Sequence, residues 1–124
     1  MNLVDSCGWL EYFADGPNAD FFAPAIEAPD TLIVPTICLF EVFKRVLQQR
    51  NESDALRAVA LMRQGQSVDL NEHLALSAAR LSFDAKLAMA DSVILCTARQ
   101  SNATLWTQDA HFKGMSGVSY VAKI

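Results

Sequence analysis

Four acidic residues stand where the sequence predicts that strands of a parallel sheet end or that helices begin. They are Asp5, Glu41, Asp91 and Asp109. In parallel α/β sheets, ligands bind beyond the carboxyl ends of the strands, where loops lead into helices. Hard divalent cations such as Mg²⁺ or Mn²⁺ prefer oxygen ligands, and a few carboxylates hold them. Because such an ion can activate water and neutralise charge on a phosphodiester, the pattern predicts metal-assisted phosphodiester chemistry.

The apolar segment AMADSVILCTA at 88–98 gives a second reason to expect a cation. On a helix, Asp91 falls on the same stripe as Ile94, Leu95 and Ala98. An isolated buried carboxylate costs several kcal/mol or takes up a proton instead. Since no basic residue at helical spacing would neutralise Asp91, a bound metal ion is the expected compensation.

Each acid also has an ordinary structural interpretation. Asp5 and Asp91 are well placed to cap helix N-termini, where aspartate accepts hydrogen bonds from free backbone N–H groups. Glu41 adjoins basic residues on its own helix and could form an exposed ion pair, and Asp109 could cap a short turn. The joint pattern favours a shared site, because all four acids arrive at the same predicted edge of the sheet.

Short apolar runs alternate with longer helix-like segments along the chain. This alternation predicts one domain over residues 1–124, of the α/β class, with three layers (α/β/α) and a central, mostly parallel sheet of four to five strands. The expected strands are 2–4, 31–34, 67–70, 103–107 and 118–122. The expected helices are 6–14, 19–28, 37–50, 53–64, 72–83 and one that starts near Asp91 after a loop at 84–90. Pro35 is expected to end the second strand, and Thr36 to cap the next helix.

Composition and charge narrow the class of protein. The 124 residues are 52% hydrophobic and 19% charged, which argues against disorder and suggests an additional hydrophobic surface for a partner. No apolar run approaches the length of about 18 residues that a membrane span needs, so we expect a cytoplasmic protein. The formal net charge is −4, but four acids in a metal site would leave ten acidic residues to balance ten Lys and Arg.

The cysteines, histidines and aromatic residues have mostly structural interpretations. The three cysteines lie in apolar surroundings without CxxC spacing, so reduced structural thiols are expected. His73 and His111 have no clear partner and are expected to be structural. Phe40 and Phe43 are expected in the core, with a dimer or partner surface as the alternative.

The chain resembles the PIN domain over essentially its whole length, and more closely the small bacterial PIN proteins that act as ribonuclease toxins in VapBC-type toxin–antitoxin pairs. The resemblance rests on the segments NLVDSCGWLEYF, IVPTICLFEVFKRV and ADSVILCTARQSNATLWTQDAHF. It implies a metal-binding, catalytic quartet and two supporting hydroxyl side chains, namely Asp5, Glu41, Asp91 and Asp109 with Ser6 and Thr107. It also implies Mg²⁺- or Mn²⁺-dependent endonucleolytic hydrolysis of RNA that leaves 5′-phosphate and 3′-hydroxyl ends, a homodimer and a cognate antitoxin.

Other residues and other functions stay open at this level. Lys44 and Arg45 lie within a turn of Glu41 and are candidates for binding RNA phosphates, with a solvated surface as the alternative. Asp84 is an additional acid that could contact the metal site from outside or simply be solvated. The alternative functions are a PIN-fold RNA-processing nuclease without an antitoxin, a receiver-like signalling domain with an acidic Mg²⁺ pocket, and a non-catalytic binding module.

Overall fold

Five short strands form one parallel sheet in the computed structural model, which describes residues 1–124. The strands are β1 (Asn2–Val4), β2 (Leu32–Pro35), β3 (Gln66–Val68), β4 (Thr104–Thr107) and β5 (Val118–Tyr120). Their order in the sheet is β3-β2-β1-β4-β5. The first strand is therefore central, with Asn2 beside Leu32 of β2 and beside Thr104 of β4.

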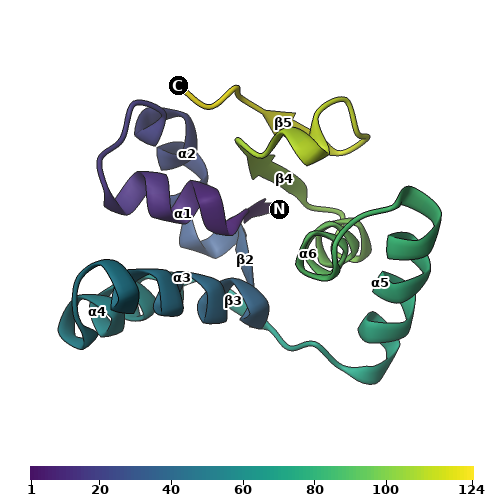
Figure 1. Cartoon of the computed structure of the whole chain (residues 1–124), viewed down its shortest axis with the longest axis horizontal. Coiled ribbons are helices and arrows are strands. Elements are labelled where there is room, and N and C mark those ends of the chain that lie inside the picture. The colour runs from purple at the N-terminus through teal and green to yellow at the C-terminus, as the bar shows by residue number, and fades with distance from the viewer.

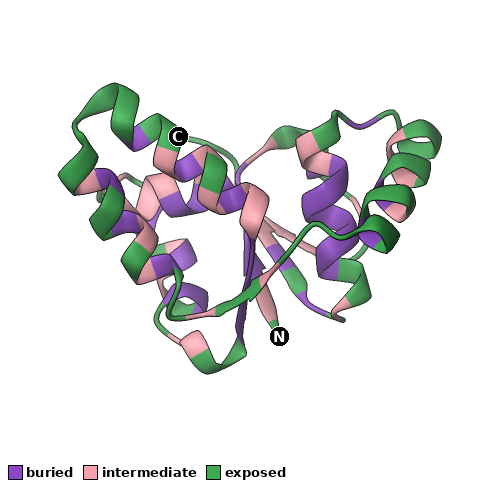
Figure 2. Cartoon of the chain, turned by 90° about the horizontal axis from the view of Figure 1, so that it is seen from below, coloured by how far each residue is buried: buried purple, intermediate pink, exposed green.

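Six α-helices cover the two faces of this sheet. They are α1 (Ser6–Phe13), α2 (Ala19–Ile26), α3 (Thr36–Gln49), α4 (Glu52–Met62), α5 (Glu72–Ala85) and α6 (Met89–Gln100). The first four lie on one side and α5 with α6 on the other, as Figures 1 and 2 show. This arrangement confirms the predicted three-layer α/β/α class, and the sheet is entirely parallel. None of these helices combines the length and hydropathy that crossing a membrane requires.

Apolar side chains from both helical layers meet the sheet in the main core. Leu3 of β1 is fully buried, and the same core includes Trp9 from α1, Phe22 from α2, and Ile94 and Leu95 from α6. Figure 2 shows these buried segments facing inward from both layers. A sheet that is covered on both faces requires strands that are apolar throughout, which explains why all four residues of β2 are buried.

The α3–α4 pair was expected from the sequence, and the two helices pack against each other around a sharp turn at Arg50 and Asn51. The Asn51 side chain accepts a hydrogen bond from the Asp54 N–H at 2.8 Å, which caps the start of α4. The turn places the second helix of the pair beside the first, on the outside of the layer that also holds α1.

Several local predictions were wrong. Helix α6 begins near Asp91 as predicted, at Met89, but α5 continues to Ala85, so the expected loop at 84–90 shrinks to residues 86–88. The exact start of α6 was not recognisable from the sequence, because its N-cap residue, Ala88, has no side chain that could accept a capping hydrogen bond. Thr36 lies inside α3 and does not cap it. Phe40 was expected in the core, yet it is 65% exposed, because Val42 and Val46 form the buried stripe of α3.

Candidate metal centre

Two of the four predicted acidic residues lie at the carboxyl ends of neighbouring strands. Asp5 directly follows β1, and Asp109 follows its neighbour β4 after one intervening residue. The chain leaves β1 toward β2 on one side and leaves β4 toward β5 on the other. Adjacent parallel strands whose connections diverge in this way leave a crevice between them, which is the usual ligand-binding position in such folds.

Asp5 is both a helix cap and a buried carboxylate. Its Oδ1 accepts the Ser6 N–H at 2.8 Å at the start of α1, and its Oδ2 accepts the Thr107 hydroxyl at 2.8 Å. The residue is only 5% exposed. Burial raises the pKa of Asp5 from 3.8 to about 6 against the opposing effect of these hydrogen bonds, and the charge of Asp91 raises it further. The capping interpretation is therefore confirmed for Asp5, and its second carboxylate oxygen is bound to Thr107 at the end of β4.

Glu41 comes to the site through a neighbour of Asp5. The Ser6 hydroxyl donates a hydrogen bond to Glu41 Oε1 at 2.7 Å, although 35 residues separate the two in sequence. Glu41 forms no ion pair with Lys44 or Arg45, so the exposed helix-surface pair considered from the sequence does not form. The backbone N–H of Ser6 binds Asp5 while its side chain binds Glu41, which holds the two acids on either side of one serine.

Asp91 and Asp109 form a tighter group with His111. His111 Nδ1 lies 3.1 Å from Asp91 Oδ2 and 3.3 Å from Asp109 Oδ1. Asp91 stands in the first turn of α6 without capping it. Burial raises the pKa of Asp91, a hydrogen bond from His111 opposes this, and the charge of Asp109 adds to it. The expectation that His111 has no partner was wrong, whereas His73 is exposed on α5.

Thr107 connects the two halves of the site. This fully buried residue donates its hydroxyl proton to Asp5 and accepts the Asp109 backbone N–H at 2.9 Å. A single hydroxyl at the end of β4 thereby fixes the Asp5 side chain and the backbone that presents Asp109. The predicted supporting residues Ser6 and Thr107 thus each contact the acids of the expected quartet.

The remaining candidates near the site do not add ligands. Cys7 Sγ lies 3.4 Å from Asp5 Oδ2, and burial together with the Asp5 charge raises the pKa of its thiol to about 12, so the thiol stays protonated. All three cysteines are free thiols, as predicted. Asp84 forms an exposed ion pair with Arg80 at 3.1 Å on α5, which is the solvated alternative considered for it.

The charge balance of the site fits a divalent cation. No Lys or Arg forms an ion pair with any of the four acids, and His111 is their only basic contact. Carboxylate oxygens at a helix start and a strand end, one of them almost completely buried, are a donor set that Mg²⁺ or Mn²⁺ can bind. Of the four, Asp91 and Asp109 lie closest to a shared ligand position, since one ligand atom from each and from His111 fall within 4.8 Å of one another.

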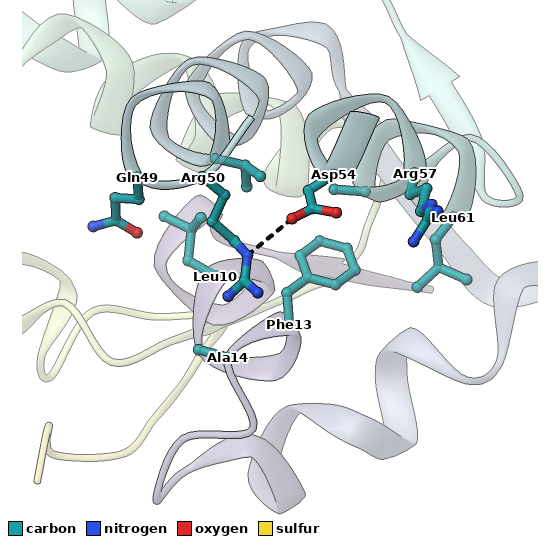
Figure 3. A pocket seen from close by; sticks show the side chains of 10 residues that line it. Leu10, Phe13, Ala14, Gln49, Arg50, Asp54, Arg57 and Leu61 are labelled. Carbon is teal, nitrogen blue, oxygen red and sulfur yellow. Dashed lines mark hydrogen bonds and ion pairs between the residues drawn. The ribbon is translucent and has the colours of Figure 1, made fainter. Parts of the chain in front are cut away.

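A separate cavity lies between α1 and the α3–α4 pair, and none of the four acids lines it (Figure 3). Its volume is about 660 Å³, and most of its wall is apolar, including Leu10, Phe13 and Leu61. Arg50 and Asp54 form an ion pair at 2.9 Å beside these side chains. On α1 and α3 the lining of the cavity begins at Leu10 and Val46, which lie one to two helical turns after Ser6 and Glu41 on the same helices.

Sequence reasoning missed two contacts in this region. His111 lies two residues after Asp109, and Asp109 Oδ1 accepts the His111 N–H at 2.9 Å at the start of a short 3-10 helix, Ala110–Phe112. The TQDAHF segment contained both residues, but only the turn geometry brings the imidazole back to the acids. The contact of Cys7 with Asp5 depends likewise on the first turn of α1.

Comparisons with known proteins agree with the fold. The sequence model of the PIN domain matches residues 3–118. A comparison with curated protein sequences gives no significant match. A toxin–antitoxin complex from Klebsiella pneumoniae contains a similar chain, with a TM-score of 0.79 and 23% identity over 96% of both chains. The Mycobacterium tuberculosis toxin VapC20, described as cleaving the sarcin–ricin loop, is similar with a TM-score of 0.77 and 12% identity over 94% of this chain and 95% of the other. VapBC-1 from nontypeable Haemophilus influenzae contains a similar chain, with a TM-score of 0.73 and 18% identity over 98% of this chain and 96% of the other.

Proposed function

Because the chain belongs to the PIN domain family, we propose that it is a metal-dependent endoribonuclease and the toxin of a VapBC-type toxin–antitoxin pair. The observation that carries the proposal is a set of four linked acids without a Lys or Arg partner. Asp5 and Asp109 follow neighbouring strands, and Ser6 and His111 connect Glu41 and Asp91 to them. Similarity to toxin chains supports the biological role, since one of them is described as a toxin that cleaves the sarcin–ricin loop and others come from toxin–antitoxin complexes.

In this proposal Asp5, Glu41, Asp91 and Asp109 hold Mg²⁺ or Mn²⁺ and are the catalytic residues. The bound ion supplies an activated water and neutralises negative charge at the scissile phosphate. Thr107 keeps the Asp5 carboxylate oriented through its 2.8 Å hydrogen bond. Ser6 does the same for Glu41 at 2.7 Å, so the acids are positioned before any ion binds.

The RNA backbone needs cations beside the acidic site. Lys44 and Arg45 are exposed on α3, within one turn of Glu41, and neither forms an ion pair with an acid. Lys44 Nζ lies 5.8 Å from the centre of the Phe40 ring. Phosphate contacts by such residues give affinity that falls with salt concentration. We therefore assign Lys44 and Arg45 to RNA binding within the proposal.

The nuclease proposal is tested by incubating purified protein with total cellular RNA in Mg²⁺, Mn²⁺ or EDTA. We expect discrete products that need the metal and that are absent with Asp91→Asn. Asp84→Asn is the matched control, since Asp84 is also an acid of the same helical layer but pairs only with Arg80. Undiminished cleavage by Asp91→Asn, or equal cleavage in EDTA, would contradict the assignment.

An antitoxin partner would cover apolar surface. The 660 Å³ cavity between α1 and the α3–α4 pair offers such a surface near the metal centre (Figure 3). Co-expression with the product of an adjacent short reading frame is expected to yield a stable complex in which RNA cleavage is suppressed. A chain that cleaves RNA but forms no such complex would instead fit the RNA-processing alternative.

We further propose a homodimer. Several large apolar side chains remain exposed outside that cavity, and the most exposed ones within helices are Phe40 on α3, Leu76 and Phe83 on α5, and Met89 on α6. Isolated exposed apolar residues are ordinary, but several of them in one small chain suit an interface between copies. Light scattering after size-exclusion chromatography distinguishes a dimer from a monomer, and a monomer at all concentrations refutes this part.

A further inference from the structure

We propose that His111 is a direct nitrogen ligand of the divalent ion held by Asp91 and Asp109, and that it makes the site prefer Mn²⁺ to Mg²⁺. This inference rests on the proposed metal-dependent function and adds a ligand that lies outside the acidic quartet. It concerns a side chain that the sequence alone suggested was structural.

The distances around His111 are those of neighbouring ligands on one ion. Two ligands at right angles, each about 2.1 Å from a metal, lie about 3.0 Å apart. His111 Nδ1 is 3.1 Å from Asp91 Oδ2 and 3.3 Å from Asp109 Oδ1. Both distances from His111 Nδ1 are therefore close to the spacing that two neighbouring ligands of one ion would have, and one ligand atom from each of the three residues lies within 4.8 Å of the others.

The high exposure of the imidazole excludes a role in core packing. The His111 side chain is 70% exposed, and its ring contacts Asp91 and Asp109 through Nδ1. The next residue, Phe112, is fully buried and anchors the 3-10 helix to the core. The Asp109 side chain also accepts the His111 backbone N–H. The turn thus presents an exposed imidazole to two carboxylates.

The identity of the donor atom sets the expected metal preference. Mg²⁺ favours an all-oxygen environment and keeps several waters, whereas imidazole nitrogen suits first-row transition ions. Exchanging one oxygen position for His111 Nδ1 therefore strengthens Mn²⁺ binding relative to Mg²⁺. Since Nδ1 faces the carboxylates, the proton of the bound neutral ring must lie on Nε2, on the solvent side.

Pulsed electron paramagnetic resonance of the Mn²⁺-loaded protein tests this directly, because a coordinated imidazole couples its nitrogen-14 nucleus to the metal electrons. We expect this coupling in the wild-type protein, its loss in His111→Ala, and its retention in His73→Ala. His73→Ala is a matched control, since the chain has two histidines and His73 lies exposed on α5. Absence of the coupling in the wild-type protein, or its persistence in His111→Ala, would overturn the proposal.

Competition binding gives a second readout that does not depend on RNA cleavage. We expect His111→Ala to lower the ratio of Mn²⁺ to Mg²⁺ affinity by about tenfold or more. His111→Asp should restore binding with an oxygen donor but keep the lowered ratio. An unchanged ratio in both variants refutes the proposal. Nitrogen coupling in a protein that cleaves no RNA would refute the proposed function alone, and cleavage without coupling would refute this inference alone.

Discussion

Replacing Asp5 with asparagine should stabilise the metal-free protein at neutral pH. The Asp5 carboxylate is 5% exposed, and burial raises its pKa from 3.8 to about 6. Because the folded-state pKa lies above the unfolded value, the folded protein binds the proton more tightly. Stability from this group is therefore complete below about pH 4 and is lost as the pH rises through about 6.

The magnitude follows from the two pKa values. At about 1.4 kcal/mol for each pKa unit, moving from 3.8 to about 6 costs the folded state about 3 kcal/mol once Asp5 is ionised. In the Asp5→Asn variant, the amide side chain would keep an oxygen to accept the Ser6 N–H, and its NH₂ group could donate to the Thr107 hydroxyl. Since that exchange reorients the Thr107 hydroxyl proton, we expect a net stabilisation of about 1–3 kcal/mol near pH 8.

The assay is urea unfolding in EDTA at pH 8 and at pH 4.5, followed by circular dichroism. The stabilisation by Asp5→Asn should be clear at pH 8 and mostly absent at pH 4.5, where the wild-type carboxyl is protonated in the folded state. Asp69→Asn is the control, since Asp69 is exposed. Saturating Mn²⁺ should stabilise the wild-type protein more than the variant, because only the wild type keeps the Asp5 ligand. Equal destabilisation by Asp5→Asn at both pH values would refute the reasoning.

Two further substitutions test the supports of the site. Thr107→Val should lower the free energy of unfolding by about 1–3 kcal/mol, because the Asp109 N–H loses its acceptor, and it should raise the pKa of Asp5. Urea unfolding measures the first effect and carboxyl ¹³C NMR the second. An unchanged pKa of Asp5 would contradict the hydrogen bond from Thr107. Gly8→Ala places a Cβ 2.6 Å from the Phe22 ring, so we expect the free energy of unfolding to fall by about 1–3 kcal/mol despite the better helix propensity of Ala. A variant as stable as the wild type in urea unfolding would contradict the close packing.

The sequence was sufficient to place two of the acids at one edge of the sheet, because the carboxyl ends of neighbouring parallel strands meet there. Asp5 and Asp109 follow directly from the positions of two apolar strands, and those strands are neighbours in the sheet. The catalytic and metal-binding roles of the four acids stay predictions. The three-layer class was also predictable, since strands and helices alternate along the chain.

Side-chain contacts across long sequence distances were not predictable in the same way. The hydrogen bond from Ser6 to Glu41 depends on how α1 and α3 are rotated about their axes, which the apolar pattern fixes only to within part of a turn. His111 reaches Asp91 because a 3-10 turn follows Asp109, and a six-residue motif does not determine that turn. Phe40 is exposed although it is apolar, because exposed hydrophobic residues cannot be told from core residues by type.

The chemistry of the cut RNA ends tests the central claim most directly. Hydrolysis by water at a metal–carboxylate site should leave a 5′-phosphate on one product and a 3′-hydroxyl on the other. Mass spectrometry of a defined single-stranded RNA cleaved in Mn²⁺ distinguishes these ends. We expect products with 5′-phosphate and 3′-hydroxyl ends, and we expect no products in EDTA or with Asp5→Asn. Products that carry a 2′,3′-cyclic phosphate would show attack by the RNA's own 2′-hydroxyl and would contradict the account.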